Sequence, residues 1–212
     1  MTLTLHDYWR SGAAWRVRIA LNLKGLKYAQ VPHNLRTGEQ RDPAYLVLNP
    51  QALIPAIETD DAVLTQSLAI LEWLEEVHPS PPLLPEGATA RAQVRAMAQI
   101  VACDIHPLNN LRVLNSLRDD FGADDAMSGA WIARWMNASF LALEAMIARH
   151  GGAYAFGDTP TFADCCLIPQ VASAQRFKVD LAPYPAIVRV AETCVAHPAI
   201  AAAHAAVQAD AD

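Results

Sequence analysis

Ser11 lies where a short apolar strand, Leu3 to Tyr8, gives way to a helix that begins near Trp15. The start of a helix has free backbone N–H groups and the positive end of the helix dipole, so it favours an anion such as a thiolate. The Ser11 hydroxyl can donate a hydrogen bond to that thiolate, and capping of the helix is the alternative role. A thiol–disulfide oxidoreductase would need cysteines in this turn, where Ser11 and Ala14 occupy the two C-x-x-C positions. This excludes protein-thiol redox chemistry.

Two later segments suit a peptide-like ligand. Pro55 follows Ile54 directly before a predicted strand, and a cis bond there would turn the N–H and C=O of Ile54 outward to pair with the ligand. An ordinary edge-strand proline is the alternative. Ser67 is predicted to cap the next helix, and Gln66-Ser67 can either hold a carboxylate at its N-terminus or serve only as a cap.

The second half of the chain has hydrogen-bond donors on otherwise apolar helices. His106 and Asn110 are four residues apart in one predicted helix and therefore share a face. Arg112 follows them, and Arg176 lies at the predicted C-terminal end of another helix, where the dipole favours a cation in any case. Because guanidinium groups bind carboxylates bidentately, the two arginines are candidates for the cationic cluster that an anionic substrate needs.

The other reactive residue types have structural interpretations. Thr161 and Asp164 form the two ends of a capping box, so Asp164 is expected to stabilise a helix and not to act as a catalyst. The four cysteines form no C-x-x-C motif and have no nearby histidine at metal-ligand spacing, which predicts buried, reduced thiols and no metal site. Reduced thiols indicate a cytoplasmic location. The cysteines are Cys103, Cys165, Cys166 and Cys194.

The composition limits the classes of function. The chain has 212 residues, of which 53% are hydrophobic and 18% charged, as in globular proteins. A net charge of −6 argues against a nucleic-acid-binding protein. The first residues do not resemble a secretory signal peptide, and no apolar stretch reaches the roughly 20 residues that span a bilayer, so we expect no membrane association.

The chain is expected to fold as two domains. Strand and helix patterns alternate in the order β-α-β-β-β-α over residues 1–80, which predicts a small mixed sheet of the thioredoxin-like kind. A proline-rich segment, Pro79 to Gly87, indicates a linker over residues 81–89. Residues 90–212 are predicted to be all-helical, with a kink at Pro107 and a fraying end beyond Ala199. The expected elements are strands at 3–8, 28–31, 56–58 and 62–65, an irregular segment at 36–45, and helices at 15–24, 67–77, 90–118, 130–150, 161–177 and 185–196.

Taken together, these segments resemble the zeta class of the glutathione transferases, which includes maleylacetoacetate and maleylpyruvate isomerases. The resemblance implies the glutathione-transferase fold, α/β followed by all-α, and a homodimer. It covers nearly the whole chain. The motifs that carry it are Tyr8-Trp9-Arg10-Ser11 with Trp15-Arg16-Val17-Arg18, Asn49-Pro50-Gln51 with Ile54-Pro55, Gln66-Ser67, His106-Pro107-Leu108-Asn109-Asn110 and Arg176-Phe177-Lys178-Val179-Asp180-Leu181.

The same resemblance implies a role for each candidate residue, with glutathione as cofactor. Ser11 would stabilise the thiolate of glutathione, and Ser11 and Arg176 would be the catalytic residues. Contacts to glutathione would come from the backbone of Ile54 beside a cis Pro55, from Gln66 and Ser67 at the γ-glutamyl end, from Gln40 at the glycyl end, and from His106 and Asn110. The small anionic substrate would be bound by Arg10, Arg112 and Arg176.

The implied reaction is the cis–trans isomerisation of a maleyl-keto acid, maleylacetoacetate or maleylpyruvate, by reversible addition of the thiolate. Two alternatives remain open: conjugation of small α-halo acids with glutathione, and a non-catalytic binding module. Two departures from the class pattern matter. Position 13 is alanine where many members have cysteine, and Leu111 precedes Arg112 where some maleylpyruvate isomerases have a second arginine.

Overall fold

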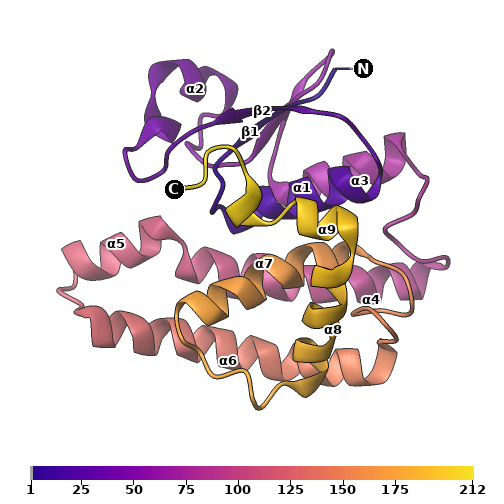
Figure 1. The fold of residues 1–212 in the computed structure, drawn as a ribbon. Helices are drawn as coiled ribbons and strands as arrows, with labels where there is room; N and C mark the ends of the chain where they lie inside the picture. Colours follow the sequence, from indigo (N-terminus) through magenta and orange to yellow (C-terminus); the bar gives the residue numbers. More distant parts are fainter. Residues whose placement is uncertain (1) are drawn as a thin grey trace. The chain divides into compact units, whose positions relative to one another are not determined.

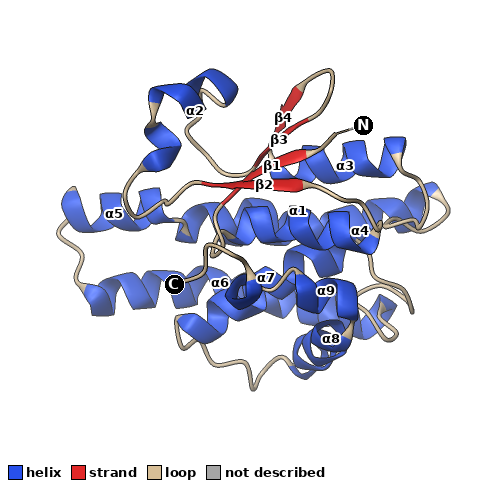
Figure 2. Cartoon of the chain, turned by 45° about the horizontal axis from the view of Figure 1, so that its top comes forward, coloured by secondary structure: helices blue, strands red, loops and turns tan. Residues whose placement is uncertain are grey.

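A four-stranded sheet organises the first half of the chain, and its strands run in the order β2-β1-β3-β4 (Figure 2). β1 pairs in parallel with β2 and antiparallel with β3, and β3 pairs antiparallel with β4. The predicted parallel pair followed by a hairpin is therefore confirmed. The strands are β1 (Thr4–Asp7), β2 (Ala29–Pro32), β3 (Ala56–Glu58) and β4 (Val63–Thr65).

The computed structural model describes residues 2–212 and separates them into two units. One comprises residues 2–83 together with Val195–Asp212, and the other comprises Leu84–Cys194. The break between Leu83 and Leu84 falls inside the predicted linker. No helix in residues 2–212 combines the length and apolar character that crossing a membrane requires.

Helices α1 (Gly12–Leu23) and α3 (Ser67–Val77) pack against each other beside the sheet (Figure 1). Their apolar side chains, with Leu5 of β1 and Ile57 of β3, form the fully buried core of this unit. α1 starts at Gly12, three residues before the predicted start, because Ser11 supplies a cap there. Gly25 ends the region with φ +65°, a conformation that favours glycine.

The segment predicted to be irregular is partly helical, so this prediction is wrong in part. Residues Glu39–Arg41 form a short 3-10 helix, η1, and Pro43–Leu48 form α2. Pro43 stands at the first turn of α2, where its missing N–H costs no hydrogen bond. The helix is only six residues long and nearly all of its residues are apolar, which leaves no helical alternation of apolar and polar residues to detect.

The unit Leu84–Cys194 is all-helical, as predicted. Its central helix is α7, which packs against α4 and carries a side-chain core that is almost entirely buried. The capping box of Thr161 and Asp164 at its start is confirmed. The unit contains α4 (Ala88–Gln99), α5 (Leu111–Asp119), α6 (Asp125–His150), α7 (Phe162–Arg176) and most of α8 (Pro185–Ala196).

The predicted helix over residues 90–118 is interrupted near Pro107, where a kink was expected, but the interruption is a full break and not a kink. α4 continues into a π-helical segment, η2 (Ile100–Ile105), and a 3-10 segment, η3 (His106–Asn109), before α5 starts afresh. Pro107 has no N–H to donate to the preceding turn, and Asn110 is extended, with φ −78° and ψ 163°. The side chain of Asn110 caps α5 by accepting the N–H of Val113 over 3.1 Å.

The end of the chain also differs from the prediction. Residues beyond Ala199 do not fray, because α9 (Pro198–Ala202) packs on α1 and a 3-10 turn, η4 (Ala205–Val207), follows. Val195–Asp212 therefore belongs with the sheet and not with the helices of residues 90–194. The physical reason is a set of hydrogen bonds from α1, and from Trp9 in the turn before it, to the backbone and side chains of this segment.

Candidate functional site

Ser11 is the N-cap of α1, with extended backbone (φ −67°, ψ 114°). Its Oγ accepts the N–H of Ala14 over 3.3 Å, and its own N–H donates to the carbonyl of Tyr8 over 2.8 Å. The side chain is half-buried, and its hydroxyl proton is still available for a hydrogen bond, because the contact to Ala14 uses Oγ only as an acceptor. The geometry is that of a hydroxyl donor next to the positive end of a helix dipole.

The Ile54–Pro55 peptide bond is cis, as the sequence suggested it could be. Neither the N–H nor the C=O of Ile54 takes part in a hydrogen bond with any described residue. Ile54 itself is buried in a cluster with Ala14, Tyr45 and Ala56. Because Ala14 is in the first turn of α1, this cluster brings the unpaired peptide groups of Ile54 close to the turn that holds Ser11.

Tyr45 supports the segment that leads into this bond. Its hydroxyl donates to the carbonyl of Leu53 over 2.6 Å, and the side-chain amide of Asn49 donates to the same carbonyl over 2.7 Å. Burial raises the pKa of Tyr45 to about 12, so the hydroxyl keeps its proton and stays a donor at neutral pH. The carbonyl before Ile54 is thus satisfied internally, whereas the N–H and C=O of Ile54 have no partner among the described residues.

Gln66 and Ser67 form the start of α3, but the cap is Gln66 and not Ser67, so this prediction is wrong. Gln66 has φ +67°, which only a few per cent of non-glycine residues adopt, and such conformations gather at functional sites. Its side-chain amide donates to Oε1 of Gln51 over 2.7 Å. No side chain caps the helix, so its first N–H groups lack intrahelical partners.

Ser67 is buried and accepts a hydrogen bond from Nη1 of Arg16 over 3.2 Å. Arg16 is itself 2% exposed, so α1 places a buried cation beneath the start of α3. A cation and free N–H groups together favour a bound carboxylate. Arg16 was not among the predicted site residues, although its place one helical turn after Gly12 is visible in the sequence.

Gln40 lies in η1 next to α2 and is 9% exposed. Its amide oxygen is buried and has no hydrogen-bond partner among the described residues. Buried amide oxygens are nearly always satisfied, so an orphaned one indicates a missing N–H donor. The sheet unit contains all of the predicted site residues of the first half of the chain: Arg10, Ser11, Gln40, Ile54, Pro55, Gln66 and Ser67. Arg10 is exposed, and its guanidinium lies 5.5 Å from the ring centre of Trp9.

His106 and Asn110 do not share a helix face, contrary to the prediction. His106 opens η3 and is half-buried, whereas Asn110 lies beyond that segment as the cap of α5. Asn109, the last residue of η3, is 8% exposed, and neither atom of its side-chain amide has a hydrogen-bond partner among the described residues. Asn109 was not among the predicted site residues, and only the adjacent asparagine pair in the sequence signals it.

Arg112 and Arg176 lie on different helices of the Leu84–Cys194 unit. Arg112 is exposed near the start of α5. Arg176 is the last residue of α7, as expected, and its guanidinium lies 4.5 Å from the ring centre of Phe177 and 3.5 Å from Oγ of Ser173. Both side chains are exposed, so they keep their charge accessible to an anion.

Three of the cysteines are buried as predicted, whereas Cys103 is exposed, so the prediction is wrong there. Burial raises the pKa values of the Cys165 and Cys194 thiols well above the ordinary range. These thiols are protonated at neutral pH and are poor nucleophiles.

Comparison with known proteins agrees with this arrangement. Residues 10–77 match the glutathione S-transferase N-terminal domain, and residues 129–206 match the C-terminal domain. A maleylpyruvate isomerase from a Ralstonia species is 53% identical over 91% of this chain and 92% of its own. A maleylacetoacetate isomerase from Pseudomonas aeruginosa is 47% identical over 98% of both chains.

Solved structures give the same result. A bacterial maleylpyruvate isomerase, described as a zeta-class glutathione S-transferase, superposes with a TM-score of 0.96 at 51% identity, over 99% of this chain and 100% of its own. A maleylacetoacetate isomerase from Methylobacterium extorquens, solved with bound malonate and glutathione, has a TM-score of 0.94 at 40% identity over 99% of both chains. The predicted glutathione-transferase fold is confirmed, and the chain belongs to the zeta class of the glutathione transferase family.

Proposed function

We propose that this protein is a glutathione-dependent cis–trans isomerase that converts a maleyl-keto acid, maleylacetoacetate or maleylpyruvate, to the fumaryl form. The observation that carries the proposal is the Ser11 hydroxyl at the start of α1, close to the unpaired peptide groups of Ile54. Relatives that bear the names of these isomerases match almost the whole chain and support the choice of reaction.

Glutathione fits the unpaired groups of the sheet unit. The N–H and C=O of Ile54 suit the cysteinyl residue of a tripeptide, which would pair with them as a strand does. The free N–H groups at the start of α3, with Ser67 and Arg16, suit the carboxylate of the γ-glutamyl end. The buried amide oxygen of Gln40 suits an N–H donor, as the glycyl end provides.

When bound, glutathione supplies a thiolate that adds reversibly to the conjugated double bond and so allows rotation about it. The Ser11 hydroxyl donates a hydrogen bond to the sulfur, and the N-terminal N–H groups of α1 favour its negative charge. Ser11 thereby lowers the pKa of the glutathione thiol, so that the thiolate is favoured near neutral pH. No cysteine or serine of the chain is required as a nucleophile.

Arg10, Arg112 and Arg176 are proposed to bind the carboxylates of the substrate. Guanidinium groups offer paired N–H donors that match a carboxylate, and they offset the negative charge of a dianionic substrate. Arg176 is proposed as the catalytic arginine, because its position at the end of α7 is fixed by Phe177 and Ser173. His106 and Asn110 remain proposed ligand contacts, with Asn110 also capping α5.

A direct assay tests the proposed reaction. The absorbance of the cis-enone is followed with enzyme, with and without glutathione, and free thiol is measured at the end. An isomerase consumes the cis form only when glutathione is present and leaves the thiol concentration unchanged. Loss of thiol in step with substrate, or turnover of a small α-halo acid in place of the enone, would identify a conjugating transferase instead.

We further infer that the enzyme is a cytoplasmic homodimer. The free cysteines support a reducing location, and the resemblance to the zeta class supports the dimer. Sedimentation equilibrium tests the second inference, because a mass twice that of one chain is expected at micromolar concentration.

A further inference from the structure

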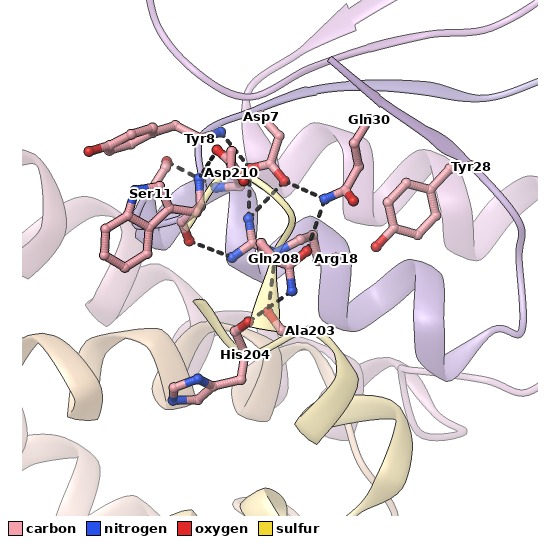
Figure 3. A network of polar contacts seen from close by, with 12 residues as sticks. Asp7, Tyr8, Ser11, Arg18, Tyr28, Gln30, Ala203, His204, Gln208 and Asp210 are labelled. Atoms are coloured by element: carbon pink, nitrogen blue, oxygen red, sulfur yellow. Dashed lines mark hydrogen bonds and ion pairs between the residues drawn. The ribbon is translucent and has the colours of Figure 1, made fainter. Parts of the chain in front are cut away.

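The C-terminal segment reaches the turn that carries Ser11. Asp210 accepts the backbone N–H of Trp9 at Oδ2 over 2.9 Å, and Trp9 is two residues before Ser11 (Figure 3). The two partners are 201 positions apart in the sequence. Both belong to the unit formed by residues 2–83 and Val195–Asp212.

The other groups of this turn are held from within the fold. Nη2 of Arg18 donates to the carbonyl of Trp9 over 2.8 Å, and Oδ1 of Asp7 accepts the N–H of Tyr8 over 2.7 Å. The N–H of Ser11 then donates to the carbonyl of Tyr8. These three hydrogen bonds join residues that are close in the sequence, whereas the N–H of Trp9 donates to a residue near the C-terminus.

The C-terminal segment is itself fixed by α1. Nε of Arg18 donates to the carbonyl of Ala203 over 3.1 Å, and the side-chain amide of Asn22 donates to the carbonyl of Ala199 over 3.1 Å. The ring of His204 packs edge-on against Trp15 at 4.9 Å between centres. Arg18 thus contacts Trp9 and the C-terminal segment at once (Figure 3). Its side chain is fully buried.

Gln208 connects the C-terminal segment to β2. Its side-chain amide donates to the carbonyl of His204 over 2.8 Å, and its oxygen accepts from Gln30 of β2 over 3.0 Å. Gln30 also donates to Asp7, which pairs bidentately with Arg18 at 2.7 and 2.8 Å. Asp210 therefore sits at the end of a connected network and is not a loose terminal residue.

We propose that Asp210 is a positioning residue for the reaction, which holds the Trp9 peptide group so that Ser11 keeps its place against the ligand sulfur. This rests on the proposed function, since only a thiolate partner makes the placement of the Ser11 hydroxyl matter for catalysis. A charge-assisted hydrogen bond to a backbone N–H is stronger than a neutral one, and small displacements of a catalytic group cost rate steeply. The carboxylate acts through geometry, because its negative charge would by itself oppose a thiolate.

Three variants test the proposal. Asp210→Ala removes the acceptor, and Asp210→Asn keeps an acceptor oxygen without the charge. Asp212→Ala is the matched control, because Asp212 forms an ion pair with Arg36 and no hydrogen bond to the Ser11 turn. Two properties are measured: hydrogen exchange of the amides in residues 8–11, and kcat and KM in the presence of glutathione.

In Asp210→Ala we expect the Trp9 amide to exchange about tenfold faster or more, because a hydrogen bond to a charged group is lost. We expect kcat to fall about tenfold with KM for the keto acid little changed. Asp210→Asn should stay within about twofold of the wild type in kcat, and Asp212→Ala should match the wild type in both properties.

The proposal is overturned if Asp210→Ala keeps the wild-type exchange rate and kcat, or if Asp212→Ala loses as much as Asp210→Ala. It is also overturned if Asp210→Asn is as slow as Asp210→Ala, since an acceptor would then not suffice. A wild type that shows no glutathione-dependent turnover would refute the proposed function instead. Even if the wild type shows no turnover, unchanged hydrogen exchange of the Trp9 amide in Asp210→Ala would refute the positioning role.

Discussion

Arg16 of α1 donates from Nη1 to Oγ of Ser67, the first residue of α3, over 3.2 Å. Both side chains are buried, so the bond is shielded from water and ties the starts of two helices together. The contact brings the guanidinium of Arg16 to the start of α3, where no side chain caps the first N–H groups. The proposed glutathione site therefore includes a contact between residues that are 51 positions apart.

This contact predicts the effect of removing the Ser67 hydroxyl. Ser67→Ala should raise KM for glutathione about tenfold, because one ligand hydrogen bond and the support from Arg16 are lost. The change in kcat should be less than about threefold, since the sulfur is held elsewhere. Steady-state kinetics with varied glutathione measure both constants. Ser116→Ala on α5 is the control, and an equal rise in KM there, or a loss confined to kcat, would contradict the assignment.

Substitution of Arg176 should affect the substrate and not glutathione. Arg176→Ala is expected to raise KM for the maleyl-keto acid about 10- to 100-fold, because a bidentate carboxylate contact is removed. Arg176→Lys should recover only part of this, since lysine keeps the charge but lacks the paired donors. The affinity for glutathione, measured by calorimetry, should not change. Arg134→Ala, at an exposed position on α6, serves as the control and should behave as the wild type.

Asp164 should matter for stability. Its buried carboxyl accepts from the N–H of Ala155, and from the N–H and Oγ1 of Thr161, at 2.8 to 2.9 Å. Burial raises the pKa of Asp164, while these hydrogen bonds act in the opposite direction. Asp164→Ala leaves these donors buried without partners, so the free energy of unfolding should fall by about 3–5 kcal/mol.

Urea unfolding followed by tryptophan fluorescence measures this loss. Glu192→Ala, an exposed substitution on α8, is the control and should change the free energy of unfolding by less than about 0.5 kcal/mol. A loss below about 1 kcal/mol for Asp164→Ala would show that the capping box contributes little.

His33 should make the stability depend on pH. Its Nε2 lies 2.9 Å from Nδ1 of His6, and its ring is tilted against that of Tyr45. Burial, followed by the charge of His6, lowers the pKa of His33 below 6.5. The folded state therefore binds this proton less readily than the unfolded chain does. The stabilisation is complete above pH 6.5 and is lost as the pH falls from there through the lowered folded pKa.

The free energy of unfolding at pH 7.5 and pH 5 measures this effect. The difference between the two values should shrink in His33→Gln, which keeps a polar side chain but does not titrate. An identical pH dependence in the variant and the wild type would show that the drop arises from other groups.

The sequence predicted most of the sheet unit. The cap at Ser11, the hairpin of β3 and β4 and the linker each depend on local patterns that a sequence displays directly. The sequence placed Val195–Asp212 with the helical domain, whereas its contacts group it with the sheet unit, because it is held by Arg18 and Asn22 across more than 170 positions. A local pattern of alanines carries no information about such a partner.

In the candidate site, too, local features were predictable from the sequence, whereas features that depend on distant contacts were not. The spacing of His106 and Asn110 predicted a shared helix face, but Pro107 and the cap at Asn110 break the helix between them. Arg16 appeared to be one more helix residue, and its role emerges only when α3 is placed beside α1. The left-handed backbone of Gln66 could not be predicted either, since glutamine has no preference for that conformation.

The central claim, that Ser11 holds a glutathione thiolate for isomerisation, is tested most directly by the thiolate absorbance of bound glutathione near neutral pH together with kcat. Ser11→Ala should bind glutathione, lose most of the thiolate signal and lose about 10²- to 10³-fold in kcat, whereas Ser11→Thr, which keeps a hydroxyl, should retain much of both. The loss of the helix cap costs only about 1 kcal/mol of stability, so the variant should remain folded. A Ser11→Ala enzyme with the thiolate signal and kcat of the wild type would contradict the claim that Ser11 stabilises the thiolate.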